Sequence, residues 1–176
     1  MANFKDSPHF AVHDDYYTPK IAWEKISHLI PKNIIILEAC MLNASQSKSA
    51  EYLKELLPTC VVRADTRLDI LKDFVPCSMI ITNIPFSTEL KKQILSRFVE
   101  IDKPFITLLN SCNLYSNYFK EIFKDKFDEV QIIHPQGKIN YDKLEDGVLK
   151  PTKNCSFYSV YLCYKMDIPT KDLWLL

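Results

Sequence analysis

Glycine is the residue that this sequence lacks most clearly. Only Gly137 and Gly147 occur among 176 residues, whereas glycine usually makes up about 7% of a chain. A glycine-rich loop lets the backbone approach a bound phosphate closely. Since both glycines lie late in the chain, any nucleotide site built from the earlier residues must work without such a loop.

Other signals are missing as well. The six cysteines form no C-x-x-C pair, and the four histidines show no metal-ligand spacing, so no metal site is predicted. Neither a signal peptide nor a long apolar run is present, and we expect an intracellular protein without membrane contact. The formal net charge is zero, so contact with nucleic acid would need a local patch of Lys and Arg.

The chain is rich in apolar and aromatic residues. There are enough of them to form the core of a single domain over residues 1–176. An irregular arm is expected at 1–15 and a polar loop at 135–154. Strands are predicted at 33–37, 60–63, 78–82, 104–109, 130–133 and 156–164. Helices are predicted from Pro19 to residue 30 and at 45–57, 89–99 and 114–127, with a short helical turn at 68–74.

This strict alternation predicts an α/β fold with a mostly parallel sheet and helices on both faces. Right-handed crossovers place the strands at 33–37 and 78–82 side by side near the middle of the sheet. Ligands of such sheets bind at the carboxyl ends of the strands. We therefore expect Glu38 and Asn83, which end these two strands, to line one crevice.

The residues Asn83-Ile84-Pro85-Phe86 follow the third predicted strand directly. The side-chain carbonyl of Asn83 and the backbone carbonyl of Ile84 can both accept hydrogen bonds from one amino group. Pro85 stiffens the turn, and Phe86 offers a flat face on which a base can stack. An ordinary strand-to-helix turn is the alternative interpretation, since Asn and Pro are common there.

This motif resembles that of adenine-specific amino-methyltransferases, in particular viral and phage DNA adenine methyltransferases, and also that of ribosomal RNA adenine dimethyltransferases. The resemblance implies a class I (Rossmann-like) methyltransferase fold, a three-layer sandwich whose last strand is antiparallel. It implies that S-adenosylmethionine is the cofactor and adenine in DNA or RNA the substrate. Asn83, Ile84 and Pro85 would hold the amine, and Phe86 would stack on the base.

Further residues match the same family pattern. Tyr17, Thr18 and Pro19 look like the segment that packs over the methionine end of the cofactor. Glu38 looks like the acid that ends the first strand, and Asp65 stands where an acid binds the ribose hydroxyls. Asp69 matches the acid near the cofactor adenine, and Phe157 matches a late aromatic residue that helps to hold the target base.

One segment departs from the family pattern. The loop after the first strand normally carries Gly-x-Gly, but here it reads Glu38-Ala39-Cys40-Met41-Leu42-Asn43-Ala44-Ser45. Asn43 is the residue in this loop that best tolerates a left-handed conformation, so it joins the predicted cofactor site. Met41 and Leu42 instead predict a filled pocket. The alternative is thus a catalytically degenerate pseudoenzyme that serves as a binding or scaffold subunit.

Contacts with nucleic acid are predicted mainly from the late loop. Lys138 and Tyr141 lie there, in a lysine-rich stretch that should overhang the crevice. The chain leaves little room for a separate target-recognition domain, so we expect either weak sequence specificity or a protein partner that supplies specificity or activity. A third possibility is a different Rossmann-like domain with a chance Asn-x-Pro-aromatic turn, which an antiparallel last strand would disfavour.

Overall fold

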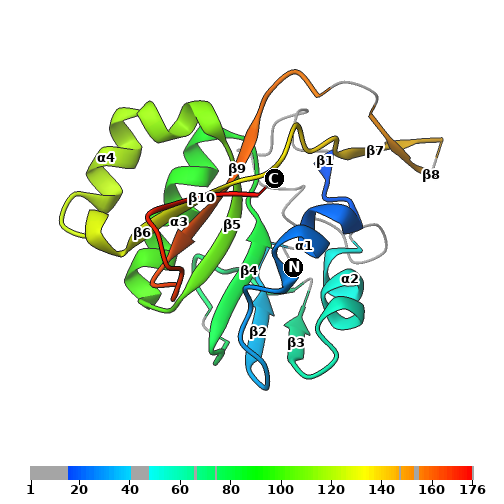
Figure 1. Cartoon of the computed structure of the whole chain (residues 1–176), viewed down its shortest axis with the longest axis horizontal. Helices are drawn as coiled ribbons and strands as arrows, with labels where there is room; N and C mark the ends of the chain where they lie inside the picture. The colour runs from blue at the N-terminus through cyan, green and yellow to red at the C-terminus, as the bar shows by residue number, and fades with distance from the viewer. Residues whose placement is uncertain are drawn as a thin grey trace.

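The computed structural model describes residues 16–40, 48–65, 67–73, 75–146, 148–152 and 155–175. Within this part of the chain, seven strands form one sheet in the order β10-β6-β9-β5-β4-β2-β3 (Figure 1). The strands are β2 (Ile35–Glu38), β3 (Val61–Ala64), β4 (Met79–Asn83), β5 (Phe105–Asn110), β6 (Val130–His134), β9 (Ser159–Tyr164) and β10 (Asp172–Trp174).

The sheet is parallel except for β9, which runs antiparallel between β5 and β6. The predicted mostly parallel sheet with one antiparallel strand is therefore confirmed, but this strand is the last but one of the sheet in chain order, whereas the last strand was predicted to be antiparallel. The short strand β10, which pairs parallel with β6, was not predicted. Its three residues include no fully buried side chain, so the apolar run that marks the other strands is missing.

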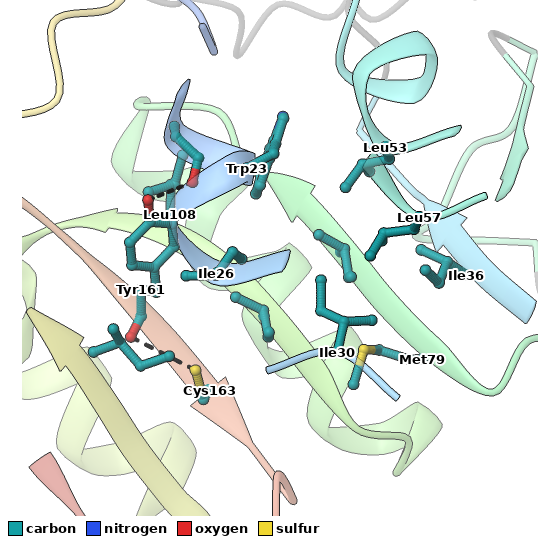
Figure 2. Packing of buried hydrophobic residues seen from close by; sticks show 14 of the residues in the cluster. Trp23, Ile26, Ile30, Ile36, Leu53, Leu57, Met79, Leu108, Tyr161 and Cys163 are labelled. Carbon is teal, nitrogen blue, oxygen red and sulfur yellow. Dashed lines mark hydrogen bonds between the residues drawn. The ribbon is translucent and has the colours of Figure 1, made fainter. Parts of the chain in front are cut away.

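Helices cover both faces of the sheet because side chains alternate along each strand. Ile36 and Ile81 face a core built with α1 (Lys20–Ser27) and α2 (Ser49–Leu56), as Figure 2 shows in part. Leu37 and Ile80 face the opposite core, built with α3 (Thr88–Ile101) and α4 (Asn117–Phe123). No helix among the described residues is long and apolar enough to cross a membrane.

The single helix predicted at 114–127 is wrong. The chain instead forms a 3-10 helix η2 (Ser111–Tyr115), then α4, then a 3-10 helix η3 (Phe127–Glu129). Ser116 interrupts the helix because its hydroxyl accepts from the Phe119 N–H at 3.3 Å and donates to the Asn113 carbonyl at 2.6 Å. The helical turn predicted at 68–74 is a turn without regular helix as far as Asp73, where its described part ends.

A second sheet occupies part of the predicted loop at 135–154. It has the order β1-β7-β8 and consists of β1 (Tyr16–Tyr17), β7 (Asp142–Glu145) and β8 (Val148–Pro151). Because these strands are polar, their composition indicated a loop. The sequence signal that was overlooked is Asp146-Gly147, a pair typical of tight hairpin turns, and Asp146 has a φ of 52°.

Candidate functional site

The predicted neighbours in the centre of the sheet are confirmed. Strand β2 pairs with β4, with Leu37 opposite Ile80, so both strands end at the same edge. Beyond them lies a cavity lined by Tyr16, Tyr17, Thr18, Glu38, Cys40, Ser49 and Asn83, which we call the crevice. Glu38 and Asn83 thus share one site, as the order of the strands requires.

Glu38 is the acidic residue of the crevice. It is only 2% exposed, and its carboxylate accepts hydrogen bonds from the Thr82 hydroxyl and, at 3.2 Å, from the Cys40 N–H. Burial raises the pKa of the Glu38 carboxyl from 4.5 to about 7, although both hydrogen bonds oppose this shift. Glu38 therefore changes charge near neutral pH.

Thr82 is a site residue that no sequence motif marks. Its hydroxyl donates to Glu38 and accepts from the Cys40 N–H at 3.1 Å, which ties the end of β4 to the end of β2. A Thr inside an apolar strand carries no distinguishing signal by itself. Its position opposite an acid became evident only once the register of the two strands was known.

Asn83 brings an unmet hydrogen-bond acceptor to the crevice. Its side-chain oxygen Oδ1 is buried and has no hydrogen-bond partner among the described residues. Buried carbonyl oxygens are nearly always paired, because an unpaired one costs about 1–3 kcal/mol. An acceptor left open beside a cavity is the arrangement expected when the missing donor belongs to a ligand.

The crevice itself is small. Its volume is about 20 Å³, which is enough for roughly one water molecule. Tyr17 and Thr18, which pack over it, are both buried, and Pro19 precedes α1 in an extended conformation. Asn43, together with Met41 and Leu42, lies outside the described residues.

The other three residues of the motif extend away from the crevice. Ile84 and Pro85 are buried, and Ile84 packs with the core beneath α3 and α4. Phe86 is half-buried and contacts Tyr16, Tyr141 and Phe157, with ring centroids between 5.3 and 5.5 Å from its own. We call these four rings the aromatic cluster.

The aromatic cluster unites residues that are far apart in the sequence. Tyr16 comes from β1, Phe86 follows β4, and Tyr141 and Phe157 flank the second sheet. Tyr141 is fully buried, and its hydroxyl shares a 2.9 Å hydrogen bond with the Ser159 Oγ atom. This hydrogen bond fixes the position of the Tyr141 ring in the cluster. The sequence predicts Phe86, Tyr141 and Phe157 at the substrate but does not indicate that their rings touch.

The two rings proposed to contact the base lie close together. The centroids of Phe86 and Phe157 are 5.3 Å apart. A base between two rings would need roughly 3.5 Å on each side, because that is the optimal separation of carbon atoms in contact. One of these rings must therefore shift before a base can lie between them.

Asp65 lies directly beyond β3, beside the crevice strand β2, as predicted. Its carboxylate is largely exposed and accepts three hydrogen bonds from Arg67, from the backbone N–H, Nε and Nη2. These hydrogen bonds lower the pKa of Asp65. A carboxylate has about four lone-pair sites, so Asp65 retains acceptor capacity.

Asp69 and Lys138 occupy more peripheral positions. Asp69 accepts from the Leu71 N–H at 3.2 Å and forms an ion pair with Lys72 at 2.7 Å, which holds the turn after Asp65 together. Lys138 is exposed, donates to the Cys155 carbonyl at 3.0 Å and lies 4.8 Å from the ring centroid of Tyr158. Neither residue lines the crevice.

Among the described residues, no group of three or more His, Cys, Asp or Glu side chains could hold a metal ion. Cys40, the cysteine nearest to the acid, is buried. Burial and the neighbouring Glu38 raise the pKa of its thiol. The thiolate is therefore disfavoured, and Cys40 is a poor candidate for a nucleophile.

Neither a protein-family model nor a curated protein sequence matches this chain. Solved structures do. A putative class I S-adenosylmethionine-dependent methyltransferase from Listeria monocytogenes aligns over 97% of this chain and 68% of its own, with 13% identity and a TM-score of 0.54. A chain from the type I R-M system aligns over 87% of this chain, with 10% identity and a TM-score of 0.52. This chain spans 42% of the length of that one.

At such low identity the comparison establishes the fold. The chain has the class I, Rossmann-like methyltransferase fold that the sequence predicted. The antiparallel strand β9 between β5 and β6 also disfavours the third possibility, an unrelated Rossmann-like domain.

Proposed function

We propose that this chain transfers a methyl group from S-adenosylmethionine to the exocyclic amino group of adenine in nucleic acid. The observation that carries the proposal is the unpaired, buried Asn83 Oδ1 at the end of β4, beside the crevice. In a class I methyltransferase fold, this edge of the sheet is where ligands bind.

Residues of the crevice and of the turn beside it suit the cofactor. The remaining lone pair of Asp65, which lies outside the crevice, can accept from a ribose hydroxyl, Asp69 in the adjoining turn would lie toward the cofactor adenine, and Tyr17 and Thr18 would cover the methionine end. The Listeria monocytogenes protein is itself described as S-adenosylmethionine-dependent. When bound, this cofactor supplies an electrophilic methyl group.

The protein would act on the amine mainly by positioning. The Asn83 Oδ1 atom and the Ile84 carbonyl accept the two amine protons, which fixes the nitrogen and turns its lone pair toward the crevice. Phe86 and Phe157 hold the base by stacking once their rings have separated. No covalent intermediate with the chain is required.

The type I R-M system chain suggests the setting of this reaction, since it belongs to an assembly of several components. We propose that this chain also acts within an assembly, in which a protein partner supplies target specificity. The target is DNA or RNA in which the adenine can leave its stack, because Asn83 Oδ1 is buried and out of reach of a base-paired amine.

Asn83→Ala tests the proposal directly. Methyl transfer should fall by roughly 100-fold or more, as when one positioned hydrogen-bonding group is removed from an active site. Nuclease digestion and mass spectrometry of adenine-containing DNA and RNA oligonucleotides measure the product. Asn83→Asp keeps an acceptor oxygen and should retain part of the activity.

The thermal stability of Asn83→Ala separates a functional role from a structural one. Because Asn83 Oδ1 lacks a partner among the described residues, its removal should leave Tm unchanged or raise it. Wild-type methylation in Asn83→Ala, or product formation on oligonucleotides without adenine, would refute the assignment.

A pseudoenzyme is the second candidate, favoured by the 20 Å³ volume of the crevice and by the loop after Glu38 that contains no glycine. In that case the fold would be kept for binding a nucleic acid or a protein partner. Absence of both cofactor binding and methyl transfer in the wild-type chain would establish this alternative.

A further inference from the structure

A second and much larger pocket lies on the other side of Phe86. Its volume is about 690 Å³, which is typical of pockets that bind small molecules. It lies between the start of α3, the 3-10 helix η2 and the start of α4. We call it the flanking pocket, because Phe86 belongs both to it and to the aromatic cluster.

The flanking pocket contains two lysines and several amides. Lys91 is only 5% exposed, and its Nζ atom donates to Asn113 Oδ1 at 3.0 Å. Lys92 lies 5.7 Å from the ring centroid of Tyr118 and forms a 3.0 Å ion pair with Glu89. Glu121 contributes one carboxylate to the lining, against two ammonium groups.

The amide groups of Asn110, Asn113 and Asn117 complete this lining. Carboxamides both donate and accept, which suits the edges of nucleobases, whereas ammonium groups suit phosphate oxygens. Asn110 Oδ1 already accepts from the Cys112 N–H at 3.1 Å. Asn113 Oδ1 accepts from Lys91 and from the Tyr118 hydroxyl. The Asn117 amide and the Asn110 Nδ2 atom have no such partner among the described residues, and an apolar ligand would leave them unpaired, so the lining favours a nucleotide unit.

The edge of the flanking pocket carries an exposed aromatic ring. Tyr158 is 60% exposed, and its carbonyl accepts from the Ser111 N–H at 2.9 Å, which places it beside the start of η2. The Nζ atom of Lys138 lies 4.8 Å from its ring centroid. An exposed ring beside a cation is the arrangement on which bases of single-stranded nucleic acid stack.

We propose that the flanking pocket and Tyr158 bind the nucleotides next to the target adenine in a single strand. Lys91 and Lys92 contact a phosphodiester, the amides contact a neighbouring base, and Tyr158 stacks on another. The proposal rests on the proposed function, since Phe86 joins this pocket to the adenine site. A duplex does not fit, because its paired bases are not free to stack on a side chain.

Fluorescence anisotropy without cofactor tests this proposal. The probes are one labelled, adenine-containing DNA strand and a hairpin duplex of the same sequence. Wild-type protein should prefer the single strand. Tyr158→Ala should weaken binding roughly five- to one-hundredfold, the range for losing one stacked base. Lys92→Gln should weaken it and reduce the slope of log K against log salt by about 0.7, the value for one single-strand phosphate contact.

Lys54→Gln is the matched control, because Lys54 is exposed on α2, which packs against the opposite face of the sheet. It should bind like the wild type. Equal binding by wild type, Tyr158→Ala and Lys92→Gln, tighter binding of the duplex, or no binding of either probe would each overturn the proposal. Single-strand binding that depends on Lys92 but occurs without methylation would uphold it and contradict the proposed function alone.

Discussion

At the scale of single residues, Asn83 and Glu38 both occupy positions that lower the stability of the fold. Asn83 Oδ1 is buried without a hydrogen bond from the described residues, and Glu38 is a carboxyl group in a place that disfavours its charged form. Natural chains retain such local costs mainly where function requires them. The two residues meet at one crevice, which is why the function is assigned there.

The raised pKa of Glu38 predicts a pH dependence of stability. The folded state binds a proton on Glu38 up to about pH 7, whereas the unfolded chain releases it near 4.5. The contribution of Glu38 to the free energy of unfolding is therefore at its maximum below pH 4.5. It decreases as the pH rises to 7, by roughly 3 kcal/mol in total. Glu38→Gln mimics the protonated form and should become more stable than wild type above pH 7.

Urea unfolding of both proteins at several pH values between 5 and 8 measures this difference. Glu51→Gln, at an exposed position on α2, is the control and should differ from wild type by the same amount at every pH. If the difference in free energy of unfolding between Glu38→Gln and wild type were also the same at every pH, Glu38 would be ionised in the folded protein throughout this range.

At the scale of elements, the central strands were predictable because buried parallel strands read as short apolar runs. Because these runs alternate with helical patterns along the chain, the strands at 33–37 and 78–82 could be placed side by side. This places β2 beside β4, and hence Glu38 near Asn83. The hairpin β7–β8 and strand β10 were missed because their side chains are largely polar or exposed. Tyr16 and Tyr141 are held in the aromatic cluster by the sheet that contains this hairpin. Their ring contacts therefore could not be predicted from the sequence either.

Helix α1 positions Tyr17 and Thr18 over the crevice. Strand β9 in turn holds α1 against the sheet. The Tyr161 hydroxyl donates to the Ala22 carbonyl at 2.5 Å, and Trp23 Nε1 donates to Ser49 Oγ at 3.2 Å (Figure 2 shows Tyr161 and Trp23). Tyr161→Phe keeps the shape but loses its hydrogen bond, which should cost about 1 kcal/mol.

Thermal unfolding measures this cost as a decrease in Tm of roughly 2–4 °C. Tyr115→Phe removes the same hydroxyl from a side chain that is 81% exposed and should leave Tm unchanged. An equal Tm for Tyr161→Phe and wild type would mean that the Tyr161 hydrogen bond does not hold α1 on the sheet.

At the scale of the whole molecule, a class I methyltransferase fold is formed although no glycine lies between β2 and α2. The crevice, the aromatic cluster and the flanking pocket lie next to one another at the carboxyl edge of the sheet. Asn83 lines the crevice, and Phe86 belongs to both the aromatic cluster and the flanking pocket, so one short turn connects the three. With a formal net charge of zero, contact with nucleic acid depends on local cations such as Lys92 in the flanking pocket and Lys138 at its edge.

Equilibrium dialysis of the wild-type chain against radiolabelled S-adenosylmethionine tests the central claim, that the carboxyl edge of the sheet from the crevice to Asp65 is a cofactor site. We predict saturable binding at one site with a micromolar Kd, weakened in Asp65→Ala, which removes the carboxylate proposed to accept from the ribose. Retention of no label at any concentration up to the millimolar range would contradict the claim.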